Sequence, residues 1–326
     1  MKTDILKQPA AIILLTEGAL LLCGVIATYG QHEAIAAVTP TAEAIERFFG
    51  GAGSFFGAAI ATLLIIVNSL LAARIVTRYS ASVVRSFVPM VLYTIAACAT
   101  TVQTGSAIPQ LTAMLLLIGA SRLIHSFKRT LVFAPAFEGY FFIGIIPLLY
   151  PAALPIALIS LLMMPIYERT PREWLAGIGG MVLPTVLCTW LWWLFGEQSV
   201  AVTLSEHLPT TNGSEFRIAE LFTLERLSEG VLLAFMVLLI LCSILSLLVA
   251  DSSMRTRPKK INWHFTLIAV GALTMLFYTE PNPYFYAMFA CGFAVIAHLF
   301  FARWPHIITL ISYLLLIVLA IGAILF

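Results

Sequence analysis

Long apolar segments recur along the whole chain, separated by short links that hold most of the charged residues. Of the 326 residues, 61% are hydrophobic and only 10% are charged, whereas an ordinary soluble domain is about 45–50% apolar and about 25% charged. A water-soluble fold could not bury that much apolar surface. The sequence therefore predicts an all-α fold, a polytopic bundle of transmembrane helices that forms a single integral membrane domain over residues 1–326.

A membrane-crossing helix needs about 17–25 largely apolar residues, so the chain is long enough for about eleven crossings. We predict crossings near 9–29, 53–75, 87–103, 108–127, 131–150, 152–167, 174–195, 229–250, 264–279, 284–302 and 305–326. Two of the links are only a proline-containing turn, Tyr150-Pro151 and Trp304-Pro305. Because such turns are short, we expect each of these two helix pairs to form a tight hairpin.

The basic residues predict how these crossings are oriented. If the N-terminus is cytoplasmic, all 18 Lys and Arg residues except Arg47, Arg217 and Arg226 fall on the cytoplasmic side. Lys and Arg are retained on that side during insertion, so we expect the N-terminus inside, the C-terminus outside, and a bacterial inner membrane as the location. The alternative is a cleaved signal peptide, because Ala34-Ile35-Ala36 is a small-x-small sequence.

The first of two long external loops covers residues 30–52. It contains His32, Glu33 and Glu46, and its residues 41–49 have the apolar and charged spacing of a short amphipathic helix.

The second long external loop covers residues 196–228 and contains His207. Its later half, 214–227, places apolar residues among charges, which is typical of a helix lying on the bilayer surface.

The external carboxylates and histidines are candidates for acid–base chemistry. Glu33 or Glu46, together with His32 or His207 from the other loop, would form an acid/base and acceptor site at the outer membrane surface. The alternative interpretation is that these side chains form an ordinary solvated face.

A few ionisable residues fall inside predicted crossings, where a charge costs about 2.5–3.5 kcal/mol near the helix centre. Among them, Glu17, Arg122 and Glu138 lie in the central to cytoplasmic part of their helices. These three would form a polar cavity that binds an anionic headgroup or a proton. In the alternative, an ion pair between Arg122 and Glu138 only holds two neighbouring helices together.

Cysteine spacing and net charge exclude several classes of function. The five cysteines lie far apart in apolar segments, without any C-x-x-C or Cys/His pairing, so we predict neither a metal site nor a cofactor. The net charge of +2 is too small to indicate a nucleic-acid partner.

Several motifs between Asn68 and Cys188 follow one another at defined spacing. They are Asn68-Ser-Leu-Leu-Ala-Ala-Arg74, Phe87-Val-Pro89-Met-Val-Leu-Tyr93, Arg122-Leu-Ile-His-Ser126, Phe137-Glu-Gly139, Gly144-Ile-Ile-Pro-Leu-Leu-Tyr150, Arg172-Glu-Trp174 and Pro184. This order resembles an uncharacterised family of multi-pass inner-membrane proteins of Bacteroidota, known as a domain of unknown function. The resemblance covers a little over a third of the chain and implies a location but no reaction.

A second resemblance concerns layout. Seven crossings with carboxylate-bearing surface helices in the first external loop and in the loop after the seventh crossing are similar to the GT-C class of polyprenyl-phosphate-sugar glycosyltransferases. The resemblance implies that Glu33 acts as the base and that a divalent metal could bind there. The sequence departs from that class, because Gln31-His32-Glu33 stands where a paired Asp-Asp or Asp-Glu is usual.

These observations lead to one main hypothesis and two alternatives. The main hypothesis is a protein of cell-envelope assembly, glycosyltransferase-like, whose partners are membrane lipids and a polyprenyl-phosphate-linked sugar handled at the outer face. The first alternative is a non-catalytic scaffold or accessory subunit bound to other inner-membrane proteins. The second is a small transporter that uses Glu17, Arg122 and Glu138.

Overall fold

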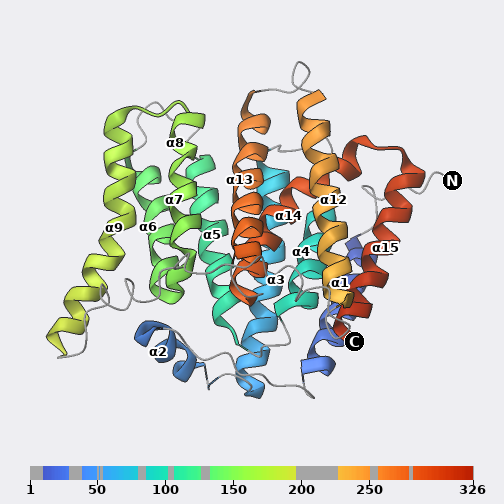
Figure 1. Ribbon diagram of the computed structural model, residues 1–326, viewed down its shortest axis with the longest axis horizontal. Coiled ribbons are helices and arrows are strands. Elements are labelled where there is room, and N and C mark those ends of the chain that lie inside the picture. The colour runs from blue at the N-terminus through green and yellow to red at the C-terminus, as the bar shows by residue number, and fades with distance from the viewer. Residues whose placement is uncertain are drawn as a thin grey trace.

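The computed structural model confirms that the described part of the chain is all-helical (Figure 1). It describes residues 10–28, 39–49, 51, 54–79, 86–101, 106–125, 133–195, 227–249, 256–278 and 282–325. Within these ranges there are α-helices, short turns and a 3-10 helix, and no β-strand.

Each predicted crossing corresponds to helical structure. The apolar helices are α1 (Ala10–Thr28), α3 (Phe55–Arg78), α4 (Val88–Thr101), α5 (Ile108–His125), α6 (Phe133–Leu149), α7 (Leu154–Leu161), α8 (Met163–Ile166), α9 (Pro171–Leu194), α12 (Leu227–Val249), α13 (Thr256–Tyr278), α14 (Pro283–Arg303) and α15 (His306–Leu325). The 3-10 helix η4 (Pro151–Ala153) lies between α6 and α7. The largest difference is in α13, which begins eight residues before the predicted 264 and takes in the basic segment Arg257–Lys260.

The amphipathic helix predicted at 41–49 is present as α2 (Pro40–Phe48). Figure 1 shows α2 at one end of the bundle, across the axes of the longer helices, whereas the turn from α8 to α9 lies at the opposite end. We name these ends the α2 end and the α8 end. The surface helix predicted at 214–227 lies outside the described residues, apart from Leu227, which begins α12.

The length and composition of the helices define a multi-pass membrane protein. Among the described residues, seven helices are long and apolar enough to cross a membrane: α3, α5, α9, α12, α13, α14 and α15. The apolar segments Ile12–Val25, Val88–Cys98, Phe133–Leu149 and Pro151–Ile166 are shorter. Large apolar side chains are exposed on the outer faces, as at Leu175, Ile307 and Val318, and in a membrane these faces contact lipid.

The central helix of the bundle is α14. It is buried along almost its whole length because α3, α4, α5, α12 and α13 pack around it (Figure 1). A Cβ atom on Gly292 would lie 2.8 Å from the carbonyl oxygen of Phe265 and 2.6 Å from the Cβ of Ala269, both on α13. The small residue thus lets the backbones of α13 and α14 come into direct contact, as is usual where helices associate in lipid.

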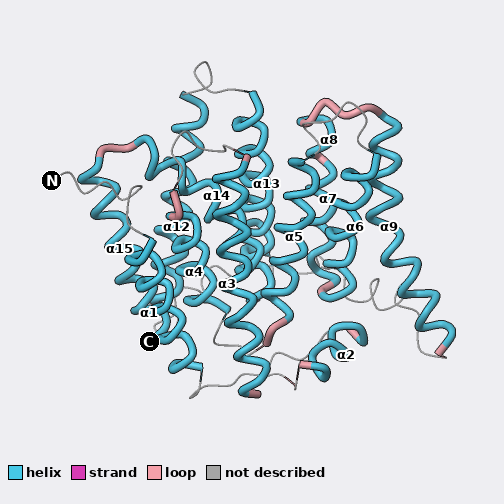
Figure 2. Tube along the Cα trace, turned by 180° about the vertical axis from the view of Figure 1, so that it is seen from behind, coloured by secondary structure: helices cyan, strands magenta, loops and turns pink. Residues whose placement is uncertain are grey.

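The helices α6 and α9 pack closely at the side of the bundle, and Figure 2 shows α9 at its edge. A Cβ on Gly144 of α6 would lie 2.2 Å from the Met181 carbonyl oxygen, and a Cβ on Gly180 of α9 would lie 2.4 Å from the Phe137 carbonyl oxygen. Two reciprocal glycines therefore bring these backbones together.

Of the two predicted hairpins, one is confirmed. The short link Tyr150–Ala153 returns α7 along α6, and the two helices pack together. The link at Trp304 is equally short, but α15 packs more extensively on α4, α12 and α1 than on α14. The tight pairing of the last two helices was therefore wrong. The physical reason is that α14 is already surrounded by other helices, and the extended backbone of Trp304 (φ −84°, ψ 159°) lets the chain leave its axis.

We expect Gly180→Ala to destabilise the pairing of α6 and α9 by about 1–3 kcal/mol, because the added methyl group meets backbone that cannot rotate away. The matched control is Gly179→Ala, where a Cβ meets nothing within 4 Å. Unfolding of both variants in detergent would measure the difference. Equal stability of the two variants would contradict the close approach of these helices.

Candidate functional site

A threonine starts α2 and attaches it to the bundle. The Thr39 hydroxyl accepts a hydrogen bond from the Ala42 backbone N–H (3.1 Å) and donates one to the Leu148 carbonyl oxygen at the end of α6 (2.8 Å). Capping by threonine and proline in the first turn both favour helix initiation. On the α9 side, the Trp192 indole N–H donates to the Thr41 hydroxyl (3.3 Å). The helix is therefore held against the ends of α6 and α9.

The two faces of α2 hold their carboxylates differently. Glu43 is exposed and forms an i,i+4 ion pair with Arg47, which is also exposed. Glu46 lies one turn after the buried Ala42, on the face turned towards the bundle, and is half-buried. Its carboxylate is hydrogen-bonded by Ser106, just before α5. Its second oxygen, Oε1, is buried and has no hydrogen-bond partner among the described residues.

Two stacked tyrosines lie beside Glu46. The rings of Tyr150 and Tyr284 are parallel at a centroid distance of 4.3 Å, and Tyr150 meets Phe285 edge-on at 5.4 Å. Glu46 is close enough to Tyr284 for the two side chains to interact electrostatically. We name Glu46, Ser106, Tyr150 and Tyr284 the α2-end cluster, in which one incompletely bonded carboxylate faces an aromatic pair.

Burial raises the pKa of Glu46 above its ordinary value of 4.5, and the hydrogen bond from Ser106 partly opposes this shift. A carboxyl group with a raised pKa exchanges protons closer to neutral pH, which suits acid–base chemistry.

The other external candidates lie outside the described residues. These are His32, Glu33 and His207. Of the predicted acid–base set, the structure therefore places only Glu46.

The intramembrane candidates are divided between two places. Arg122 of α5 and Glu138 of α6 form an ion pair with a 3.3 Å separation between Nη1 and Oε2. Both side chains are about half exposed, at 54% and 48%, so the pair lies on the surface of the bundle. Glu17 is only 3% exposed and hydrogen-bonds elsewhere, to Ser69 and Thr94. The structure thus joins Arg122 to Glu138 and does not join either to Glu17.

Glu17 belongs instead to a set of buried polar side chains from other helices, which the predicted site did not include. The hydroxyls of Ser69 and Thr94 lie 2.6 Å and 3.0 Å from Glu17 Oε1.

The residues that precede Ser69 and Thr94 in the chain, Asn68 and Tyr93, form a second group of hydrogen bonds with Gln110. The Tyr93 hydroxyl donates to Gln110 Oε1 (2.7 Å), and the Asn68 amide N–H group donates to the Gln110 carbonyl oxygen (2.9 Å) and lies 3.1 Å from the Tyr93 hydroxyl. We name Glu17, Asn68, Ser69, Tyr93, Thr94 and Gln110 the intramembrane polar network. The signal that could have found it is several hydrogen-bonding residues at helical spacing inside apolar segments.

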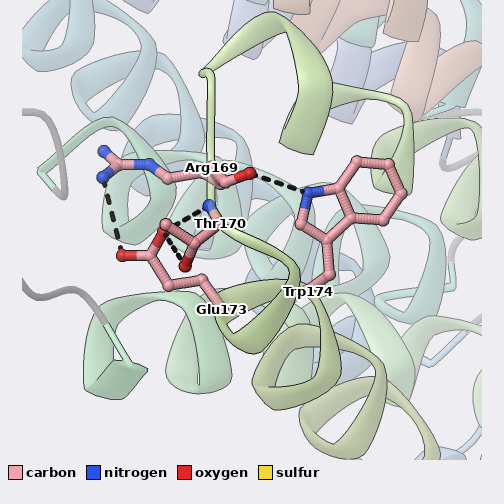
Figure 3. A network of polar contacts seen from close by, with 4 residues as sticks. All are labelled: Arg169, Thr170, Glu173 and Trp174. Atoms are coloured by element: carbon pink, nitrogen blue, oxygen red, sulfur yellow. Dashed lines mark hydrogen bonds and ion pairs between the residues drawn. The ribbon is translucent and has the colours of Figure 1, made fainter.

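At the α8 end, the Arg-Glu-Trp segment stabilises the start of α9 (Figure 3). Glu173 Oε2 accepts hydrogen bonds from the Thr170 backbone N–H (2.9 Å) and hydroxyl (3.2 Å), while the Trp174 indole N–H donates to the Arg169 carbonyl oxygen (3.2 Å). Arg169 lies 3.9 Å from the other Glu173 oxygen. Two residues of the Arg172-Glu-Trp174 motif, Glu173 and Trp174, thus take part in the cap of this helix.

A second contact at the α8 end ties the turn before α9 to α13. Glu168 lies 2.8 Å from the Lys260 ammonium group, and this partner lowers the pKa of the Glu168 carboxyl. The Tyr167 hydroxyl lies 2.5 Å from His264 Nδ1, also on α13. Both contacts position the turn, and neither lies in a cavity that the structure describes.

Comparison with models of known protein families, with curated proteins and with solved structures found no match. In the part of the chain that the structure describes, there is no group of three or more His, Cys, Asp or Glu side chains arranged to hold a metal ion. The candidate site is therefore argued from geometry.

We expect the contact between α2 and the bundle to weaken as the pH rises above the ordinary pKa of 4.5 for Glu46. The raised pKa means that the docked state binds the proton more tightly than the undocked state, so the contribution of Glu46 to docking is largest at low pH and is lost as Glu46 ionises, while the Thr39 and Trp192 contacts remain. A spin label at the exposed position 48 would report this as increasing mobility between pH 4.5 and neutrality. In Glu46→Gln the mobility should not change with pH, and a wild-type signal that is equally constant would contradict the prediction.

Proposed function

We propose that the chain lies in a bacterial inner membrane with its N-terminus and α8 end in the cytoplasm and its α2 end outside. The charges support this orientation: Arg47 is on α2, whereas Arg78, Arg122 and Arg303 lie in the last turns of α3, α5 and α14, and Arg169 lies in the turn from α8 to α9. Basic residues retained at one end are the main determinant of orientation during insertion.

A labelling experiment tests the orientation. In a variant whose native cysteines are replaced, a single cysteine at the exposed position 48 should react with a membrane-impermeant thiol reagent applied outside intact cells. A single cysteine at Arg172, which is also exposed, should react only after the membrane is opened. Labelling in the reverse order would overturn the orientation, and labelling of both from outside would overturn the threading.

We further propose that the protein is a glycosyltransferase-like enzyme of cell-envelope assembly, which handles a polyprenyl-linked or lipid substrate at the outer face. The observation that carries this proposal is the placement of Glu46. It lies at the α2 end on a helix held against the bundle, and its Oε1 is buried without a hydrogen-bond donor among the described residues. A buried acceptor oxygen without a partner is unfavourable unless a ligand supplies the donor.

The proposed reaction begins at Glu46 Oε1. In a transfer reaction the acceptor hydroxyl donates to Glu46 Oε1, the carboxylate takes its proton, and the alkoxide oxygen bonds to the sugar carbon as the polyprenyl phosphate leaves. The apolar faces at the α2 end give the polyprenyl chain access from the lipid. Ser106, bonded to the same carboxylate, orients it for proton transfer.

The GT-C resemblance also implies a divalent metal, and the described residues do not fit one. The α2-end cluster offers a single carboxylate and the hydroxyls of Ser106 and two tyrosines. Magnesium and calcium are bound through several oxygen ligands, and carboxylates dominate such sites. No step of the proposed reaction is therefore routed through a metal.

A paired substitution on α2 tests the function. We expect Glu46→Gln to reduce the affected transfer by about 10²–10⁴-fold, the usual effect of losing a general base. Glu43→Gln, on the exposed face of the same helix, should leave it unchanged. The glycan and glycolipid profiles of cells carrying each variant provide the measurement.

Two outcomes would reject the transfer function. Identical profiles for the two variants and the wild type would remove Glu46 from any such reaction. If a mild-detergent pull-down from the same cells then recovered a stable membrane partner, the scaffold alternative would be supported in its place.

A further inference from the structure

The hydrogen-bond geometry around Glu17 indicates where its proton lies. The Ser69 hydroxyl oxygen is 2.6 Å from Glu17 Oε1 and 2.8 Å from the Ile66 carbonyl oxygen. A hydroxyl group has only one hydrogen to donate. If Ser69 donates to the carbonyl group of its own helix, the short contact with Glu17 requires a hydrogen on the carboxyl group.

The second hydroxyl shows the same arrangement. Thr94 Oγ1 lies 3.0 Å from Glu17 Oε1 and 3.1 Å from the Met90 carbonyl oxygen. Both hydroxyls thus approach the same oxygen of Glu17, and the described residues provide Glu17 with no ion-pair partner. A protonated Glu17 adds a third hydrogen to those of Ser69 and Thr94 and so meets three of the four contacts, whereas an ionised Glu17 leaves two hydrogens for four contacts and a buried charge in an apolar bundle.

The described titratable side chains near Glu17 are of types that carry no positive charge. Cys23 lies on the same helix, Cys98 of α4 is close enough to interact with Glu17 electrostatically, and Tyr313 of α15 lies near Thr16. None of these side chains supplies a positive charge, so the surroundings favour the protonated carboxyl group.

The intramembrane polar network leads from Glu17 towards the α2 end. Asn68 and Tyr93 directly precede Ser69 and Thr94 in the chain, and both contact Gln110. Gln110 lies in the first turn of α5, and Ser106 of the α2-end cluster lies two residues before this helix begins.

One atom of the network points to a ligand. Asn68 is fully buried, and its side-chain oxygen Oδ1 has no hydrogen-bond partner among the described residues. A buried acceptor of this kind is suited to a proton donor that passes through the network.

We propose that Glu17 is a proton-binding residue inside the membrane, which exchanges its proton with the α2 end through the intramembrane polar network. The proton leaves Glu17 for a water molecule that enters from the α2 end, giving a carboxylate and a hydronium ion. Both hydroxyls then donate to the carboxylate. This proposal does not rest on the transfer reaction at Glu46.

Infrared spectroscopy of the full chain in lipid vesicles tests the first half of the proposal. A protonated carboxyl group has its own C=O stretching band, distinct from that of a carboxylate. We expect such a band at neutral pH in the wild type and its complete loss in Glu17→Gln. If the two spectra are the same, Glu17 is ionised and the proposal is overturned.

Deuterium exchange tests the route. After transfer to heavy water the Glu17 band shifts as its proton is replaced, and we expect this shift to be slowed about tenfold in Tyr93→Phe, the rate equivalent of one lost hydrogen bond. Gln110→Leu, a second interruption of the network, should slow it too. The control is Ser243→Ala, because Ser243 is buried on α12 and hydrogen-bonds only within its own helix.

The outcomes of the exchange experiment separate the alternatives. Slow exchange in both network variants, with a retained Glu17 band and an unchanged control, supports the route. Wild-type exchange rates in both variants would overturn it, even if Glu17 is protonated. The band itself verifies that each variant has kept the environment of Glu17, so a misfolded variant is recognised by its loss.

Discussion

The apolar surroundings of the helices in lipid are the constraint on which the rest of this structure depends. In lipid, every backbone N–H and C=O group must be paired within its own segment, and helices satisfy this requirement residue by residue. Because lipid is as apolar as the helix surfaces, association then relies on close packing. Gly144, Gly180 and Gly292 allow backbone contact between α6 and α9 and between α13 and α14. The result is a central helix, α14, enclosed by its neighbours.

The same constraint gives weight to the polar groups that remain inside. A carboxyl group at 3% exposure, such as Glu17, is tolerated only if its hydrogen-bonding capacity is met, and Ser69 and Thr94 meet it. Asn68 Oδ1 and Glu46 Oε1 are buried oxygens without a hydrogen-bond partner among the described residues. A proton donor or a substrate can therefore bind to them. The two features to which these atoms belong come close in the chain at the start of α5, since Ser106 precedes this helix by two residues and Gln110 lies in its first turn.

At the two ends of the bundle, side-chain contacts hold short connecting segments in place. At the α8 end, the Glu173 cap, the Glu168–Lys260 ion pair and the Tyr167–His264 contact attach the turn before α9 to α13. At the α2 end, Thr39 and the Tyr150–Tyr284 stack do the same for α2 and the α6–α7 link. Both carboxylate oxygens of Glu173 have partners, whereas Glu46 Oε1 has none among the described residues.

The amino-acid sequence by itself determined the helical class, the position of each apolar helix and the amphipathic nature of α2, because apolar length and spacing are properties of neighbouring residues. It also predicted that Arg122 and Glu138 would meet, since their helices are consecutive. Only the tertiary structure decided that Glu17 pairs with hydroxyls of α3 and α4, that Glu46 turns towards Ser106, and that α15 leaves α14. Those contacts join residues far apart in the chain. They depend on how each helix is rotated about its axis and on which helices lie beside it, and neither can be read from helices that are apolar on nearly all faces.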